Sequence, residues 1–111
     1  MTFSSKNIFA SILPPGSDEQ FETLWQNKHL QLQRIVSHGH GHATPPGQWY
    51  DEDQDEWVIV LQGSAELRIE DQEQSINLGA GDYLLIPAHT RHRVDCTAPD
   101  CPTIWLALHS K

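Results

Sequence analysis

Three histidines, at positions 38, 40 and 42, alternate with glycines near the middle of the chain. In an extended segment alternate residues lie on the same side, so these three imidazoles could together bind Zn²⁺ or Ni²⁺. We favour the plainer interpretation, a flexible loop with adventitious metal affinity, because glycine-rich segments resist a single fixed geometry. His42 is the strongest individual candidate for a metal ligand, since Pro45, Pro46 and Gly47 hold the following chain near the ordered body.

The elements that must position such residues are predicted to be short strands. From position 30 onward, apolar runs and apolar–polar alternation are separated by turns rich in glycine and proline. Short, closely spaced strands of this kind are typical of an all-β sandwich or barrel, and in so short a chain of a single small barrel. The predicted strands span residues 30–37, 57–62, 65–69, 74–78, 83–86, 91–95 and 103–109.

The first thirty residues have a different pattern. Ser17 and Gln20 have the spacing of a capping box, and Phe21, Leu24 and Trp25 then fall on one helical face. The pattern predicts a short helix over about 17–26 that packs on the main body. We therefore expect residues 1–29 to form an N-terminal extension with this helix, and residues 30–111 to form the barrel.

Composition limits the class of protein. A chain of 111 residues is the size of one domain, and its formal charge of −8 disfavours nucleic acid and anionic membranes as partners. The longest apolar runs have five residues, too few to span a bilayer, and the N-terminus has no convincing secretory signal. We expect a cytoplasmic protein in which Cys96 and Cys101 stay reduced.

Two motifs follow one another in the second half of the chain. In the first, Glu56 is followed after six residues by Gly63. In the second, Gly81 is followed after five residues by Pro87, and His92 lies five positions further on. In this order and at this separation they resemble the two motifs of the cupin superfamily, and in particular small bacterial single-domain cupins.

The resemblance covers residues 30–109 and implies a fold, a site and an assembly. The fold is a double-stranded β-helix, also called a jelly-roll barrel, and such proteins commonly form homodimers. In the family, the first motif supplies two histidines in a His-x-His pair and a glutamate, and the second supplies a third histidine, all to a divalent metal. By position, Glu56 takes the carboxylate role and His92 the role of the second-motif imidazole.

The His-x-His pair of the family is missing from this chain. Its positions hold either Tyr50 and Glu52 or Trp49 and Asp51, depending on the register, and neither register offers a histidine. The three-histidine set is therefore incomplete, and a metal would need other ligands.

A set of carboxylates with one imidazole is the alternative. Asp51, Glu56 and His92 could converge at the barrel mouth, with Glu52 as a substitute for Asp51. Such an oxygen-rich set suits Mn²⁺, Fe²⁺ or Mg²⁺, whereas the histidine loop would suit Zn²⁺ or Ni²⁺. The competing interpretation is a solvated acidic loop from 51 to 55, with Glu56 and His92 paired to each other or to an arginine.

Two further residues are candidates for proton transfer. His89 lies two positions after Pro87, where the family usually has glycine, and either lines the pocket beside His92 or sits exposed in a turn. Tyr50, close to the expected mouth, is a possible ligand contact or proton donor.

Three hypotheses follow. The leading one is a barrel that binds a small molecule, with or without a divalent metal beside it, and a metal-dependent isomerase, lyase or dioxygenase is its enzymatic alternative. The second is a non-catalytic sensor or interaction domain that has lost its metal, favoured by the missing His-x-His. The third is a metal buffer built on the histidines at 38, 40 and 42.

Overall fold

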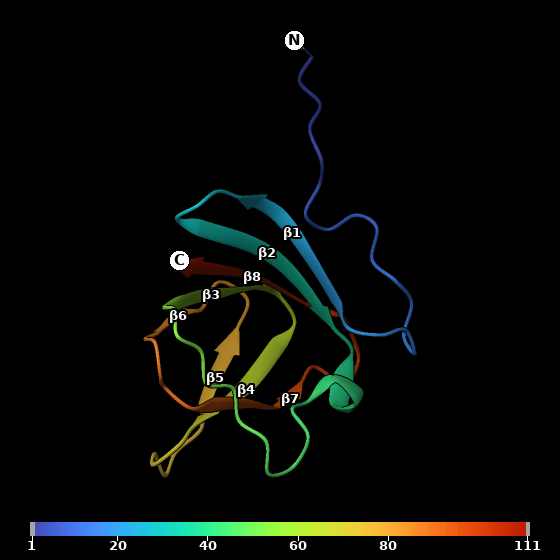
Figure 1. The fold of residues 1–111 in the computed structure, drawn as a ribbon. Coiled ribbons are helices and arrows are strands. Elements are labelled where there is room, and N and C mark those ends of the chain that lie inside the picture. Colours follow the sequence, from blue (N-terminus) through green and yellow to red (C-terminus); the bar gives the residue numbers. More distant parts are fainter. Residues whose placement is uncertain (1, 111) are drawn as a thin grey trace.

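The computed structural model describes residues 2–110, apart from the side chains at positions 40 and 41. Two antiparallel sheets form a barrel, one of five strands in the order β1-β2-β8-β3-β6 and one of three in the order β5-β4-β7 (Figure 1). This confirms the expected all-β barrel. The strands are β1 (Gln20–Gln26), β2 (Leu30–Ser37), β3 (Glu56–Gln62), β4 (Ser64–Ile69), β5 (Ile76–Gly79), β6 (Tyr83–Ile86), β7 (His92–Thr97) and β8 (Thr103–Ser110).

The core lies between the two sheets. Val58 and Val60 on β3 and Trp105 and Ala107 on β8 point inward at alternate positions, opposite Leu67 on β4. Each is at most 5% exposed, and burying an aliphatic side chain of this size stabilises a fold by about 1.5–3 kcal/mol. Apolar packing thus fills the middle of the barrel between the two sheets.

The predicted helix over 17–26 is wrong, because residues 20–26 form strand β1. β1 pairs antiparallel with β2, and Phe21 lies opposite Ile35. The Gln20 side chain does not cap a helix but accepts from the backbone N–H of Leu13 at 2.9 Å. A cap contributes about 1 kcal/mol, which is less than a ladder of backbone bonds to an existing sheet edge. No α-helix occurs in residues 2–110. Within these residues there is no helix long and apolar enough to cross a membrane.

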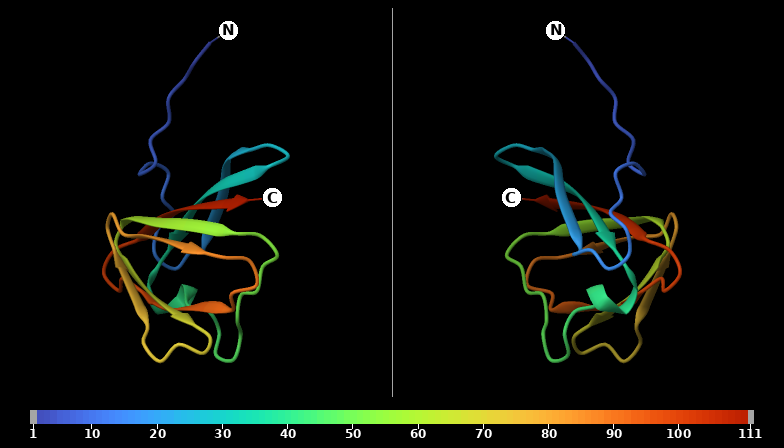
Figure 2. Two further views of the ribbon diagram at one scale, coloured as in Figure 1. Left: turned by 90° about the vertical axis from the view of Figure 1, so that its left-hand side faces the viewer. Right: turned by 90° about the vertical axis from the view of Figure 1, so that its right-hand side faces the viewer.

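The chain before β1 runs along the outer face of the five-stranded sheet and then away from the barrel (Figures 1 and 2). Arg34, on β2 and 3% exposed, holds it there. Its guanidinium donates to the backbone carbonyls of Ile8 and Ala10 and pairs with Glu22. Without these two carbonyls the buried guanidinium would lose two hydrogen-bond acceptors, so the N-terminal segment and β2 depend on each other.

The histidine loop forms a short 3-10 turn, η1 (Gly39–His42). The Nε2–H of His42 donates to the Ser17 carbonyl at 3.0 Å, and the Nε2–H of His38 donates to the Leu13 carbonyl at 3.0 Å. Both imidazoles therefore attach the turn to the N-terminal segment. The side chain of His40 lies outside the described part of the chain.

Candidate metal and ligand site

A cavity of about 150 Å³ opens at one end of the barrel. Its apolar lining includes core residues such as Trp105, and its polar residues come from six separate segments of the chain. This combination of an apolar wall and a few convergent polar groups is typical of small-molecule sites. The polar lining residues are Glu19, Gln33, His42, Tyr50, Glu52, Glu56, His92 and His109.

Glu56 and His92 face each other in this cavity, as the family motifs imply. They are the first residues of β3 and β7, and the His92 Nε2 lies 3.7 Å from Glu56 Oε1. The Nδ1–H of His92 donates to the Thr90 carbonyl at 2.8 Å. Because one ring nitrogen is used in this way, the Nε2 lone pair of the neutral imidazole is directed at the cavity and is available to a metal.

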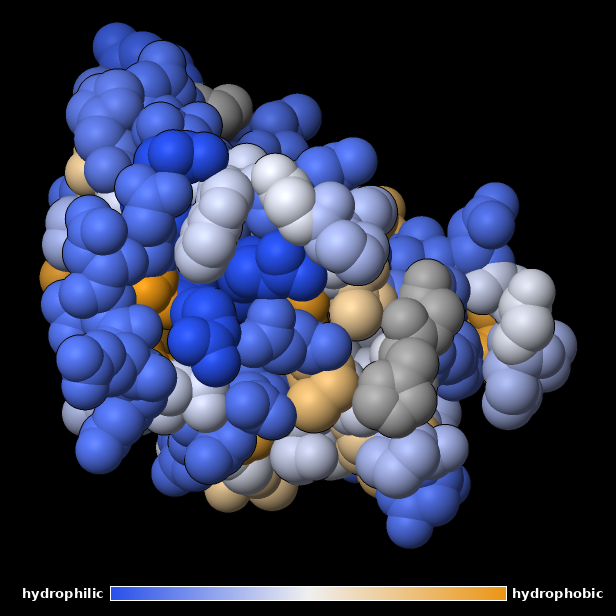
Figure 3. Space-filling model, turned by 90° about the horizontal axis from the view of Figure 1, so that it is seen from below, coloured by the Kyte–Doolittle hydropathy of each residue, from blue (hydrophilic) through white to orange (hydrophobic). Residues whose placement is uncertain are grey.

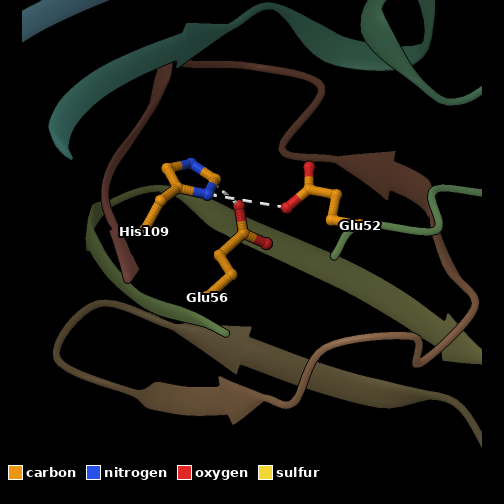
Figure 4. A group of neighbouring side chains, drawn as sticks. All are labelled: Glu52, Glu56 and His109. Atoms are coloured by element: carbon orange, nitrogen blue, oxygen red, sulfur yellow. Dashed lines mark ion pairs between the residues drawn. The ribbon is translucent and has the colours of Figure 1, made fainter. Parts of the chain in front are cut away.

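His109 joins the same cluster from β8. Its Nε2 lies 3.3 Å from Glu56 Oε2 and its Nδ1 lies 3.5 Å from Glu52 Oε2 (Figure 4). The pairing of β3 with β8 sets His109 directly opposite Glu56, and residues opposite one another in a ladder share a face. The side chains of Glu56 and His109 are 13% and 12% exposed, so this pair is largely shielded from solvent.

Nearby carboxylates help to raise the pKa values of His92 and Glu52. Burial alone would lower the pKa of His92, but its hydrogen bonds with Glu56 and Thr90 and the nearby carboxylates raise the pKa overall. Burial raises the pKa of Glu52, and the negative charge of Glu56 raises it further. His92 and Glu52 therefore hold a proton more readily than the free side chains do, as expected for groups beside buried carboxylates.

These residues fit a divalent cation. Glu52, Glu56 and His109 offer ligand atoms that all lie within 4.8 Å of one another. The His92 Nε2, beside Glu56, provides a further nitrogen from the opposite sheet. Two carboxylates and two imidazoles match the preference of Mn²⁺ and Fe²⁺ for mixed oxygen and nitrogen ligands.

The structure selects one of the two registers left open by the sequence. Tyr50 and Glu52 line the cavity, whereas Trp49 and Asp51 do not. The cause is an isolated bridge in which Tyr50 and His92 exchange two backbone hydrogen bonds, of 2.7 and 3.0 Å. The bridge sets the Tyr50 ring 5.6 Å from the His92 ring, and the two-residue period then brings Glu52 to the same side.

Asp51 and His89 lie outside the cavity. The His89 Nδ1 is 3.5 Å from Asp51 Oδ1, and these side chains are 72% and 49% exposed. His89 adopts a φ of 62°, a conformation natural for glycine, and its N–H donates to the Glu52 carbonyl at 2.7 Å. The two residues border an open groove that leads to Glu52 and His109, so they are placed at the entrance of the site.

His42 lines the cavity, but both of its ring nitrogens are engaged. Its Nδ1 accepts from the backbone N–H of His38 at 2.7 Å, and its Nε2–H donates to Ser17. The ring is therefore a neutral imidazole with no lone pair left for a metal. Its hydrogen bonds give it a role in holding the N-terminal segment.

Sequence reasoning assigned no role to His109 and treated Glu52 only as a substitute for Asp51. A signal for His109 existed in the alternation of Trp105, Ala107 and His109, which puts all three on one face of a strand. That alternation does not say which strand lies beside β8. Only the sheet order does, and it brings His109 to Glu56.

The comparisons with known proteins agree with this architecture. A family model described as a cupin domain matches residues 34–109. A crystal structure from Ralstonia eutropha JMP134, of a protein provisionally named a mannose-6-phosphate isomerase, is 44% identical, with 97% of this chain and 98% of that chain covered and a TM-score of 0.91. No curated protein matches.

More distant solved structures share the fold. A cupin superfamily protein from Desulfitobacterium hafniense DCB-2 is 21% identical over 89% of this chain and 83% of that chain, with a TM-score of 0.70. KdgF from a Halomonas species is 23% identical over 90% and 84%, with a TM-score of 0.68. The fold and site thus define a small single-domain cupin barrel. The chain belongs to the cupin family.

Proposed function

We propose that this cupin binds a small organic molecule in its barrel beside a divalent metal held by Glu52, Glu56, His92 and His109. The observation that carries the proposal is the convergence of two carboxylates and two imidazoles at the polar end of one cavity. His109 takes the place of the imidazoles that the first motif lacks. The set differs from the one suggested by sequence, because His109 and Glu52 replace His42 and Asp51.

Each ligand is supported by its surroundings. The Thr90 carbonyl orients His92, and Glu56 lies between the two imidazoles with one oxygen toward each. When bound, a divalent metal would act as a Lewis acid toward a carbonyl or hydroxyl group of the ligand. Tyr50, whose ring lies 5.6 Å from that of His92, is placed to contact the same ligand.

A metal-dependent isomerase is the second candidate. It is favoured by the provisional name of the R. eutropha protein, which is 44% identical over nearly its whole length. It is also supported by the presence of proton-carrying side chains, Tyr50 and His92, on one wall of the cavity. Isomerisation of a hydroxy-carbonyl compound requires a metal or acid to polarise the carbonyl and a group to move a proton.

The test is elemental analysis of untagged protein, supplied in turn with Mn²⁺, Fe²⁺, Zn²⁺ and Ni²⁺. We expect near-stoichiometric metal in the wild type, loss of it in His109→Ala and in His92→Ala, and full retention in the triple replacement of histidines 38, 40 and 42 by alanine. Metal retained in His109→Ala would contradict the proposed ligand set. Metal lost only in the triple variant would move the site to the loop.

A further inference from the structure

Glu19 stands on the cavity wall but comes from outside the matched cupin region of residues 34–109. It directly precedes β1, at the end of the N-terminal segment. That segment is held by the Ser17 carbonyl, which accepts from His42, and by the Leu13 carbonyl, which accepts from His38. The histidine turn therefore explains why a residue of the extension can face the cavity.

The orientation of the Glu19 carboxylate is set by a chain of buried donors. The Trp105 indole Nε1–H donates to Ser37 Oγ at 3.3 Å, and Ser37 Oγ–H donates to Glu19 Oε2. An indole can only donate, so the single proton of the fully buried Ser37 hydroxyl is committed to Glu19. Within residues 2–110, the hydrogen bond to the Glu19 carboxylate goes to Oε2, so the second oxygen, Oε1, is free to accept from a ligand.

The cavity carries negative charge without a compensating arginine or lysine. Its lining includes three carboxylates, Glu19, Glu52 and Glu56, and no guanidinium or ammonium group from residues 2–110. A bound divalent cation would offset two of these three negative charges. Burial also raises the pKa of Glu19, because the charged carboxylate is less well solvated at this position.

The arginines of the barrel are engaged elsewhere. Arg91 pairs with Glu70 at 2.8 Å, while Arg68 and Arg93 pair with Asp95 at 3.2 and 2.8 Å. These pairs involve residues of the three-stranded sheet and its turns. The face of the molecule seen from below is largely hydrophilic, with smaller hydrophobic areas (Figure 3). Arg34, on β2, donates to carbonyls of the N-terminal segment. None of these residues lines the cavity.

The groove that leads into the cavity has the same character. It is lined by the amides of Gln31, Gln33 and Gln54 and by acidic residues such as Asp53, again without arginine or lysine from the described residues. Amides both donate and accept hydrogen bonds, so they suit uncharged hydroxyl groups. A ligand with an ammonium group would be disfavoured for two reasons: a bound divalent cation would repel it, and the apolar inner wall would not solvate its charge.

We propose that Glu19 is a specificity-determining residue that makes this site select small uncharged, hydroxyl-bearing molecules over their phosphorylated or carboxylated counterparts. The inference rests on the proposed function, since it assigns the ligand class of that same site. The cavity volume of about 150 Å³ limits the size of the part of the ligand that the barrel encloses. A cavity of that size holds about one benzene-sized group. The rest of a longer ligand would lie in the amide-lined groove.

The test uses matched neutral and anionic probes on the full-length protein, both metal-free and loaded with Mn²⁺ or Zn²⁺. The pairs are glycerol with glycerol 3-phosphate and D-mannose with D-mannose 6-phosphate. The indole N–H signal of Trp105, the tryptophan that lines the cavity, reports binding by NMR in the Zn²⁺-loaded and metal-free samples, and calorimetry reports it with Mn²⁺. We expect the neutral member of at least one pair to bind at least tenfold more tightly than its phosphate.

Two variants test whether Glu19 causes the selectivity. Glu19→Gln keeps an oxygen that accepts from Ser37 and removes the charge, so we expect the neutral-to-phosphate affinity ratio to fall about tenfold. Glu73→Gln removes the same charge from an exposed turn and should leave the ratio unchanged. Equal or tighter phosphate binding by the wild type, an unchanged ratio in Glu19→Gln, or no binding of either neutral probe would overturn the inference. Failure of metal uptake in the same samples would instead count against the proposed function.

Discussion

The chain has two histidine clusters, and their surroundings give them different chemistry. At the barrel mouth, His92 and His109 face Glu56 and Glu52, and ring nitrogens lie 3.3–3.7 Å from carboxylate oxygens. In the turn before β3, the ring nitrogens of His42 and the Nε2 of His38 instead bond backbone groups. A cation can replace the protons of the first cluster, whereas the second would have to give up hydrogen bonds that hold the N-terminal segment.

Replacing Glu56 should have the largest effect, because its two oxygens face both imidazoles of the mouth cluster. We expect Glu56→Gln to weaken metal binding by at least a hundredfold, since one of the two proposed carboxylate ligands is lost. Metal titration by calorimetry measures this. Glu66→Gln on β4 is a matched control and should bind metal as the wild type does.

Replacing His42 should affect folding and leave metal binding intact. His42→Ala removes two hydrogen bonds to the backbone, at 2.7 and 3.0 Å, and we expect a loss of about 1–3 kcal/mol in the free energy of unfolding. Urea unfolding gives the stability, and elemental analysis gives the metal content. A stable variant that no longer takes up metal would break the contrast between the two clusters.

The metal-free protein should lose stability as the pH rises above neutral. The pKa of His92 is higher in the folded protein than its ordinary value of 6.5, so the folded state binds the extra proton more tightly. This contribution is fully present below pH 6.5 and disappears as the pH rises through the raised folded pKa. Thermal unfolding between pH 6 and 9 measures it, and His92→Gln should flatten the profile. A stability that increases over this range in the wild type would contradict the proton-binding role of the cluster.

The smallest effect is expected at the groove. Asp51→Asn and His89→Ala break an exposed pair, and exposed pairs contribute about 0–1 kcal/mol. We therefore expect metal affinity within about twofold of the wild type, measured by the same titration. A loss comparable to that of Glu56→Gln would place the metal in the groove.

The barrel was predictable because its signals are local. Alternation, turn residues and the two motifs predicted strands at 30–37 and 83–86, which agree with β2 and β6 residue for residue. The motifs also brought Glu56 and His92 together correctly, since both begin strands on facing sheets. The helix over 17–26 failed because the local pattern of Phe21, Leu24 and Trp25 carries no information about a free sheet edge at β2.

The sequence by itself determined the all-β class, the cupin family and the carboxylate–imidazole pair of the two motifs, because each depends on residue type and on spacing along the chain. Only the tertiary structure decided that Glu52 and not Asp51 faces the cavity, that His109 completes the cluster and that Glu19 reaches it. These three outcomes depend on which strands become neighbours and on which face each residue takes. Neighbouring strands are chosen by long-range packing, in which residues far apart in the chain, such as Glu56 and His109, come together.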